Sequence, residues 1–177
     1  MASFWDRIIR AAKLDSALYE EVEADKGALG QAMGVVVLSS IAAGVGTIGR
    51  GGPGGILTGT IVALVGWYVW AYLVYFIGTK FLPEAQTKAD HGELLRTVGF
   101  SSSPGLIRIL GIIPAVTGIV FLGASIWMLV AMVVAVRQAL DYESTLRAVG
   151  VCAIAWVFQT LILLLVLYLL GVPVKPV

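Results

Sequence analysis

The sequence predicts an all-α, polytopic membrane protein with five transmembrane helices and an amphipathic helix at its N-terminus. Of the 177 residues, 59% are hydrophobic and 13% are charged, whereas about a quarter of the residues in a soluble domain are charged. The apolar residues form long runs, and charged residues bound those runs. With a net charge of +1 the chain has no strongly basic surface, which argues against a nucleic-acid partner.

Residues 1–28 predict a cytoplasmic segment that is first amphipathic and then acidic. The apolar arc of its first helix contains Phe4, Trp5, Ile8, Ile9 and Ala12. The opposite arc contains Asp6, Arg7, Arg10 and Lys13. We expect this helix to lie in the membrane interface, with the Trp5 indole at the headgroups and the three basic residues towards anionic lipid. An equally supported alternative is that the apolar arc docks onto the protein's own spans.

The acidic part predicts a second helix, for which Asp15 or Ser16 is the expected N-cap. Its carboxylates are those of Glu20, Glu21, Glu23 and Asp25. Anionic lipid repels such a face. We therefore expect a solvated linker helix, and the alternative is a contact with a basic protein partner.

Residues 29–177 predict a membrane domain of five helices. About 20 residues are needed to cross a hydrocarbon core of ~30 Å, and three apolar runs have that length. A fourth run, from 97 to 136, has 40 residues, which predicts two crossings joined by a turn that ends at Pro114. The predicted spans are therefore about 29–49, 55–78, 97–112, 114–136 and 149–171.

The distribution of charge places the N-terminus in the cytoplasm and the C-terminus outside. With these spans, nine of the 12 Lys and Arg residues and all 11 acidic residues lie on the same side of the membrane as the N-terminus. The positive-inside rule assigns that side to the cytoplasm. No carboxylate and no histidine lies within a predicted span, which argues against transport by a proton relay.

The chain contains no arrangement of residues that is typical of an enzyme. The serines at 101–103 have no histidine base within the membrane, and the GxGxxG pattern at 44–49 ends a membrane helix and follows no strand. His91 and the two acids beside it are expected in a solvated loop rather than in a metal site. We expect no catalytic residue, no metal and no cofactor.

Small residues four positions apart occur in the first two spans. They are Gly30, Gly34, Gly55 and Gly59. Such spacing lets helices approach closely in lipid. We expect these glycines to mediate packing inside the five-helix unit, and the alternative is a homodimer face.

Aromatic side chains share one face of the second span and form the other candidate site. They are Tyr68, Tyr72, Tyr75 and Phe76. Such a face would line a cleft for lipid tails, between the second span and a third span that Pro104 bends. Ordinary aromatic packing against neighbouring helices is the favoured alternative.

Several segments occur in a characteristic order and spacing. They are 19–25, Gly66-Trp67, 95–105 with Gly99 and Pro104, 112–114 and 126–141. In this order they resemble the Yip family, the five-span membrane proteins first known as Ypt/Rab GTPase interactors, in its bacterial branch. The resemblance covers nearly the whole chain. It implies a cytoplasmic N-terminus, five helices and no known catalysis, with roles of eukaryotic relatives in vesicle formation, membrane shaping and small-GTPase binding.

The leading hypothesis is therefore a non-enzymatic protein of the bacterial inner membrane that organises or shapes the membrane or scaffolds partner proteins. One alternative is the binding or passage of a lipid or another apolar small molecule. Another is an accessory subunit of a larger membrane complex. The expected partners are membrane lipids, a membrane or cytoplasmic protein, and a second copy of the chain.

Overall fold

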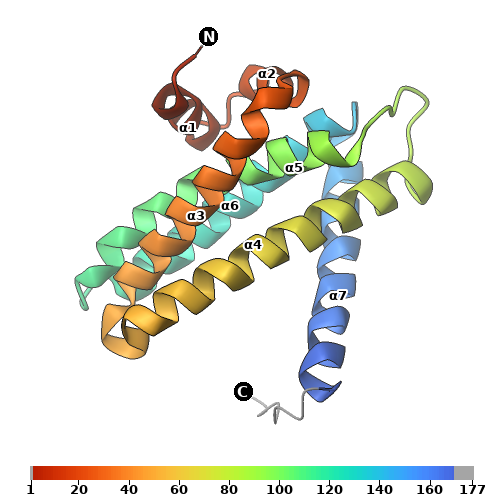
Figure 1. The fold of residues 1–177 in the computed structure, drawn as a ribbon. Helices are drawn as coiled ribbons and strands as arrows, with labels where there is room; N and C mark the ends of the chain where they lie inside the picture. Colours follow the sequence, from red (N-terminus) through yellow and green to blue (C-terminus); the bar gives the residue numbers. More distant parts are fainter. Residues whose placement is uncertain (1, 170–177) are drawn as a thin grey trace.

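Four long apolar helices form the body of the molecule. The computed structural model describes residues 2–169, and all regular elements within that range are helical. The four helices are α3 (Leu29–Gly46), α4 (Ile48–Lys80), α6 (Thr117–Ala139) and α7 (Thr145–Leu169). Each contains a segment that is long and apolar enough to cross a membrane. Figure 1 shows α3 and α4 side by side, with α7 crossing α4 obliquely, and η2 packs between α3 and α6.

The predicted span at 97–112 is not a single long helix. It consists of two short helices, α5 (His91–Phe100) and the 3₁₀ helix η2 (Ser103–Ile112). The break has a local cause, because Pro104 opens η2 without an amide hydrogen. The hydroxyls of Ser101 and Ser103 each donate to a backbone carbonyl three residues earlier, at 2.7 Å.

Helix α5 begins earlier than the predicted span because its N-terminus is closed by a capping box. The carboxylate of Asp90 accepts from the amide of Glu93 at 2.8 Å, and the carboxylate of Glu93 accepts from the amide of Asp90 at 2.7 Å. Beyond η2, residues 113–116 turn the chain back into α6. The chain thus turns at 113–116, a little later than the expected turn ending at Pro114, and α6 begins at Thr117.

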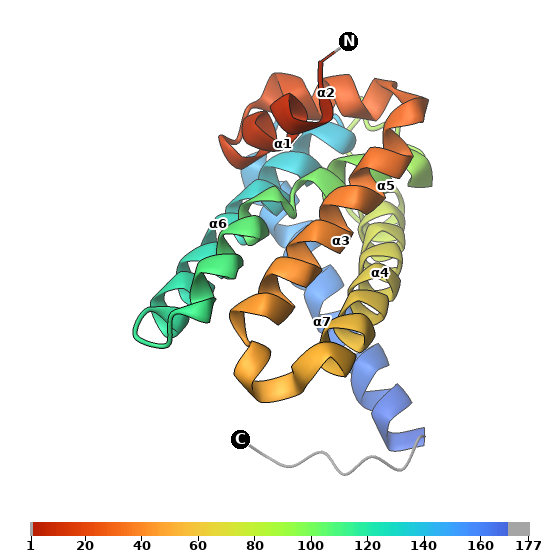
Figure 2. The same ribbon diagram turned by 60° about the vertical axis from the view of Figure 1, so that its left-hand side comes forward.

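Helices α1 (Phe4–Ala12) and α2 (Ser16–Ala24) lie across one end of the long helices (Figure 2). The N-cap of α1 is Ser3, whose hydroxyl accepts from the amide of Asp6. The N-cap of α2 is Asp15, one of the two expected residues. We call α1 and α2 together the N-terminal cap.

The glycine-rich segment at 50–55, between the first two predicted spans, is largely helical. Helical structure continues from Ile48 into α4, with a kink at Gly52, where φ is 59° and ψ is −170°. An L-residue with a side chain rarely adopts this conformation, so glycine is required there. Residues 54–80 are the part of α4 that has the length and hydropathy of a membrane span.

Buried side chains form two clusters. One joins α4, α5, α6 and α7 around Val74, Leu94 and Val136. The other joins the N-terminal cap to α3, α5 and α6 around Leu18, Tyr19 and Phe100. Beyond residue 155, α7 exposes most of its large apolar side chains, as expected of a helix that faces lipid.

Candidate functional site

Arg7 holds the N-terminal cap together from the inside. Its Nε donates to Glu21 Oε1 at 2.9 Å, Nη1 donates to Gln31 Oε1 at 3.0 Å and Nη2 donates to Asp25 Oδ2 at 2.8 Å. Arg7 is 3% exposed. The expectation that Arg7 faces anionic lipid is therefore wrong, because the acids of α2 draw its guanidinium towards the core.

The acidic side chains of α2 are likewise paired with basic and polar side chains of the same protein. Arg10 donates to Glu21 Oε2 at 2.6 Å and to Asp15 Oδ2 at 2.8 Å. The hydrogen bond from Arg10 is the main cause that lowers the pKa of Glu21, and the one from Arg7 lowers the pKa of Asp25. Gln138 of α6 donates to Glu20 Oε1 at 2.6 Å. The expected solvated linker helix is thus replaced by a helix docked through its carboxylates.

Glu23 differs from these paired acids. Burial, and next the charges of Glu20, Glu93 and Asp141, raise the pKa of Glu23 to about 8. Its Oε2 atom is buried and has no hydrogen-bond partner among the described residues. Glu23 is therefore a carboxyl group that titrates near neutral pH at the junction of α2 and the long helices.

Arg96 of α5 fixes the end of α2, a role that the sequence alone did not predict. Its Nε donates to the carbonyls of Val22 and Glu23 at 2.9 and 3.1 Å, and its Nη2 also donates to the carbonyl of Glu23. These carbonyls lie in the last turn of α2, where no amide within the helix reaches them. A lone arginine at the start of an apolar run was the available signal.

Helix α1 combines a docked face with an exposed one. Ile8 and Ala11 are buried, the Phe4 ring packs near Gly34, and the Trp127 indole donates to the carbonyl of Ala12 at 2.8 Å. The exposed side chains of α1 include Trp5 at 61% and Ile9 at 53%, and Lys13 follows the helix in an exposed position. The burial of Ile8 differs from its expected place at the lipid interface and fits docking onto the spans.

Of the four glycines expected to pack helices together, three face open space, and only Gly34 faces another helix. A Cβ added at Gly30, Gly55 or Gly59 would have no atom within 4 Å, and one at Gly34 would meet Phe4 of α1 at 3.5 Å. The close approaches occur at other glycines. At Gly99, an added Cβ would lie 2.7 Å from the Cβ of Ala32.

The tyrosines of the predicted lipid cleft surround His91 instead. The ring centroids of Tyr68, Tyr72 and Tyr75 lie 5.0, 5.7 and 6.3 Å from that of His91, all with tilted planes, while Phe76 is stacked on Tyr72. His91 was expected in a solvated loop, but it is the first residue of α5. Neither of its ring nitrogens has a hydrogen-bond partner among the described residues.

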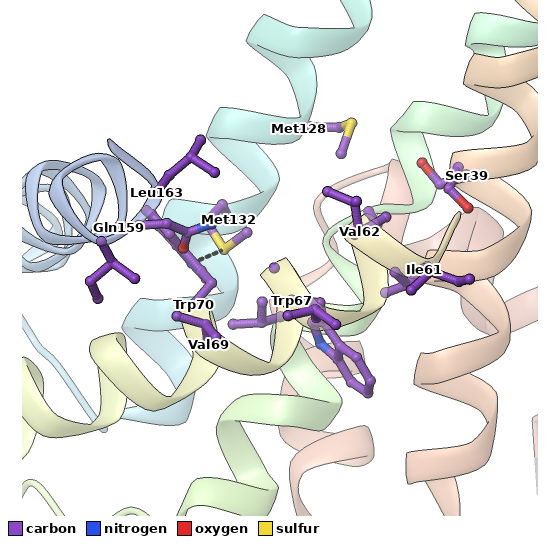
Figure 3. A pocket seen from close by; sticks show the side chains of 18 of the residues that line it. Ser39, Ile61, Val62, Trp67, Val69, Trp70, Met128, Met132, Gln159 and Leu163 are labelled. Atoms are coloured by element: carbon purple, nitrogen blue, oxygen red, sulfur yellow. Dashed lines mark hydrogen bonds between the residues drawn. The ribbon is translucent and has the colours of Figure 1, made fainter. Parts of the chain in front are cut away.

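A cavity of about 670 Å³ does lie between α4 and its neighbours, but none of the four aromatic residues of the predicted cleft lines it. Its walls include Trp67 and Trp70 of α4 and Met128 and Met132 of α6. The Trp70 indole donates to the Met132 sulfur at 3.2 Å, the dashed line in Figure 3. Pro104 is buried and is absent from these walls.

Polar groups interrupt this apolar wall at separate places. Ser39 of α3 and Gln159 of α7 approach the cavity from opposite sides in Figure 3. Arg108 of η2 also lines it. A largely apolar cavity with a few polar groups is the common form of a small-molecule site.

Sequence comparison supplies the family. A model described as the Yip1 domain matches residues 16–168, which include α2 and every long helix but leave α1 outside. Comparisons with curated proteins and with solved structures gave no significant match. Because the matched region covers most of the 177 residues, the chain belongs to the Yip family of membrane proteins.

Proposed function

We propose that this Yip1 domain protein is a non-enzymatic organiser of the membrane, acting through insertion of α1 into the headgroup layer of one leaflet. The observation that carries the proposal is the orientation of α1. Trp5 and Ile9 are 61% and 53% exposed, although the opposite face of the same helix is docked onto the long helices. An exposed indole and aliphatic group beside a basic residue are typical of interfacial helices.

Helix α1 is held in a fixed position by hydrogen bonds to other helices. Arg7 joins α1 to α2, and the Trp127 indole joins the end of α1 to α6. A helix held in this way inserts apolar volume on one side of the bilayer at a fixed position relative to the spans. Insertion into one leaflet favours curvature and packing defects in that leaflet.

The topology that places α1 in the cytoplasmic leaflet is part of this proposal. We propose that α5 and η2 together make a fifth crossing of a bacterial inner membrane. Ten α-helical and ten 3₁₀ residues extend over about 15 and 20 Å, which compares with a ~30 Å core. The excess of Lys and Arg on the N-terminal side supports a cytoplasmic N-terminus and an external C-terminus.

Reconstitution of the full chain tests the proposal. The protein is incorporated at several protein-to-lipid ratios into vesicles of phosphatidylethanolamine and phosphatidylglycerol, and vesicle diameters are measured by electron cryo-microscopy. We expect the wild-type chain to reduce the mean diameter, and the double variant Trp5→Glu, Ile9→Glu to lose this effect. Ala17→Glu, at an exposed position of α2, is the matched control and is expected to act like wild type.

The vesicle measurement has a clear opposing outcome. If wild type and the double variant give the same diameters at equal incorporation, α1 does not organise the membrane and the proposal is wrong. Circular dichroism of both proteins verifies that they retain the same helix content.

A further inference from the structure

Two buried polar atoms without partners line the same apolar cavity. They are Nε of Arg108 and Oε1 of Gln159, and neither has a hydrogen-bond partner among the described residues. Leaving a buried donor or acceptor unsatisfied costs about 1–3 kcal/mol, and more for a charged group. Two such atoms from η2 and α7 on one cavity indicate that a further polar molecule completes the site.

The charge of Arg108 defines the chemistry of that molecule. Within residues 2–169 Arg108 forms no ion pair; its Nη2 donates to the Ser125 hydroxyl at 3.1 Å, and its Cζ lies 5.6 Å from the centre of the Phe121 ring. The sequence has no acidic residue from 94 to 140, nor from 26 to 83, so α3, η2 and α6 offer no carboxylate. A guanidinium stays protonated even in apolar surroundings and therefore calls for an anion.

The position of Arg108 defines the shape of the ligand. Arg108 lies four residues before Ile112, the end of η2, so it is about 8 Å from the 113–116 turn at the 3₁₀ rise. The turn is the point where the chain leaves one crossing and begins the next. The other walls of the cavity, including Trp67, Trp70 and Met132, are apolar. An anion near the membrane surface, joined to a long apolar chain, matches this gradient.

We propose that the cavity binds an anionic phospholipid of the bilayer. Its phosphate accepts a hydrogen bond from Nε of Arg108, and one acyl chain lies between α4 and α6, along Trp67, Trp70 and Met132. The volume of about 670 Å³ lies in the usual range for a bound small molecule. This site is separate from the surface of α1 and does not depend on the function proposed for it.

Native mass spectrometry of the full chain in detergent tests the site without any variant. Delipidated protein is titrated with dioleoyl phosphatidylglycerol and with dioleoyl phosphatidylethanolamine, which have the same acyl chains. We expect the anionic lipid to bind roughly tenfold more tightly, because the ammonium group of phosphatidylethanolamine offsets the charge that its phosphate presents to Arg108. Equal affinities, or retention of neither lipid, would overturn the proposal.

Variants then separate the headgroup contact from the acyl contact. Arg108→Gln is expected to lower the affinity for phosphatidylglycerol to that for phosphatidylethanolamine. Lys80→Gln removes a positive charge at the other end of α4, and we expect it to keep the wild-type preference. Ala63→Phe places a ring into the cavity wall, and we expect it to weaken binding of both lipids.

These variants also have outcomes that contradict the site. If Arg108→Gln keeps the preference for phosphatidylglycerol, another group recognises the headgroup. If Ala63→Phe binds both lipids as tightly as wild type, the acyl chain lies elsewhere. Helix content is compared by circular dichroism. If Arg108→Gln does not fold, Arg108→Lys takes its place and is expected to retain the preference for the anionic lipid, because the positive charge remains.

Discussion

Arg7 and Asp25 meet although 18 residues separate them, with 2.8 Å between Nη2 and Oδ2. The guanidinium side chain of Arg7 is 4% exposed, while the carboxylate side chain of Asp25 is 30% exposed. The ion pair therefore spans the boundary between the interior of the cap and its surface. It closes α1 against α2 and brings the apolar face of α1 onto the long helices.

Replacing Arg7 by alanine should release α1. The loss leaves Glu21 and Asp25 without their central cation, and we expect docking to weaken by about 1–3 kcal/mol, since the acids are partly screened by water. Amide hydrogen exchange of residues 8–12 is expected to speed up, while exchange within α6 is unchanged. Lys13→Ala, an exposed position, is the control, and equal exchange in both variants would argue against the cluster.

The docking of the cap should weaken as the pH rises. The pKa of Glu23 is about 8 in the docked cap and about 4.3 for a free glutamate, so docking binds a proton between these values. The contribution of Glu23 is therefore fully present below about pH 4.3, declines as the pH rises towards 8 and is constant above that.

The paired acids have the opposite dependence, because Asp15, Glu21 and Asp25 have lowered pKa values and lose their contribution in acid. Exchange of the α2 amides, corrected for intrinsic rates, should thus be faster at pH 8 than at pH 6. Glu23→Gln should abolish the difference. Glu143→Gln, at an exposed carboxylate, should retain it; a flat profile in wild type would refute the assignment.

Two glycine substitutions should have opposite effects. Gly99→Ala places a Cβ 2.7 Å from that of Ala32, so α3 and α5 must separate, at a cost of about 1–3 kcal/mol. Gly59→Ala meets no atom within 4 Å, and we expect it to be neutral or to stabilise α4 by less than about 1 kcal/mol. Thermal unfolding in mild detergent measures both, and equal melting temperatures would contradict the packing described.

Tyr142→Phe should destabilise the contact between the end of α4 and the segment that joins α6 to α7. The Tyr142 hydroxyl bonds the carbonyls of Gly78 and Leu82 at 3.0 and 2.7 Å, and the side chain is 4% exposed. Its removal leaves a buried carbonyl without a donor, at about 1–2 kcal/mol. Tyr68→Phe changes a side chain that is 55% exposed, and its melting temperature should stay within error of wild type.

The long helices could be predicted from the sequence because the length and hydropathy of a run determine whether it can cross a membrane. The beginning of α5 was not predicted, because His91 and the acids beside it were expected in a solvated loop, although Asp90 and Glu93 have capping-box spacing. The break before Pro104 was harder, because a proline both begins and bends helices. Whether the helix ends there depends on which carbonyls accept hydrogen bonds from the hydroxyls of Ser101 and Ser103.

The candidate sites were less predictable because they depend on the direction in which each side chain points and on partners that are distant in the sequence. A helical projection places Arg7 on a polar face, but its partners come from another helix, 14 and 18 residues later. Glycine spacing likewise does not tell which neighbour a helix faces. On α4 the tyrosines and the pair Trp67 and Trp70 lie on different arcs, and only the packing of α6 and α7 decides which arc borders a cavity.

The bonds between the cap and the rest of the chain set an order for biogenesis. Arg96 follows Glu23 by 73 residues, and Trp127 follows Ala12 by 115. At about 5–20 residues per second, the ribosome needs roughly 4–15 s after Glu23 to make Arg96. The helices synthesised first therefore cannot complete their docking until α5 and α6 have been made, and until then Ile8 and Leu18 of the nascent chain are in contact with the translocon, lipid or a chaperone.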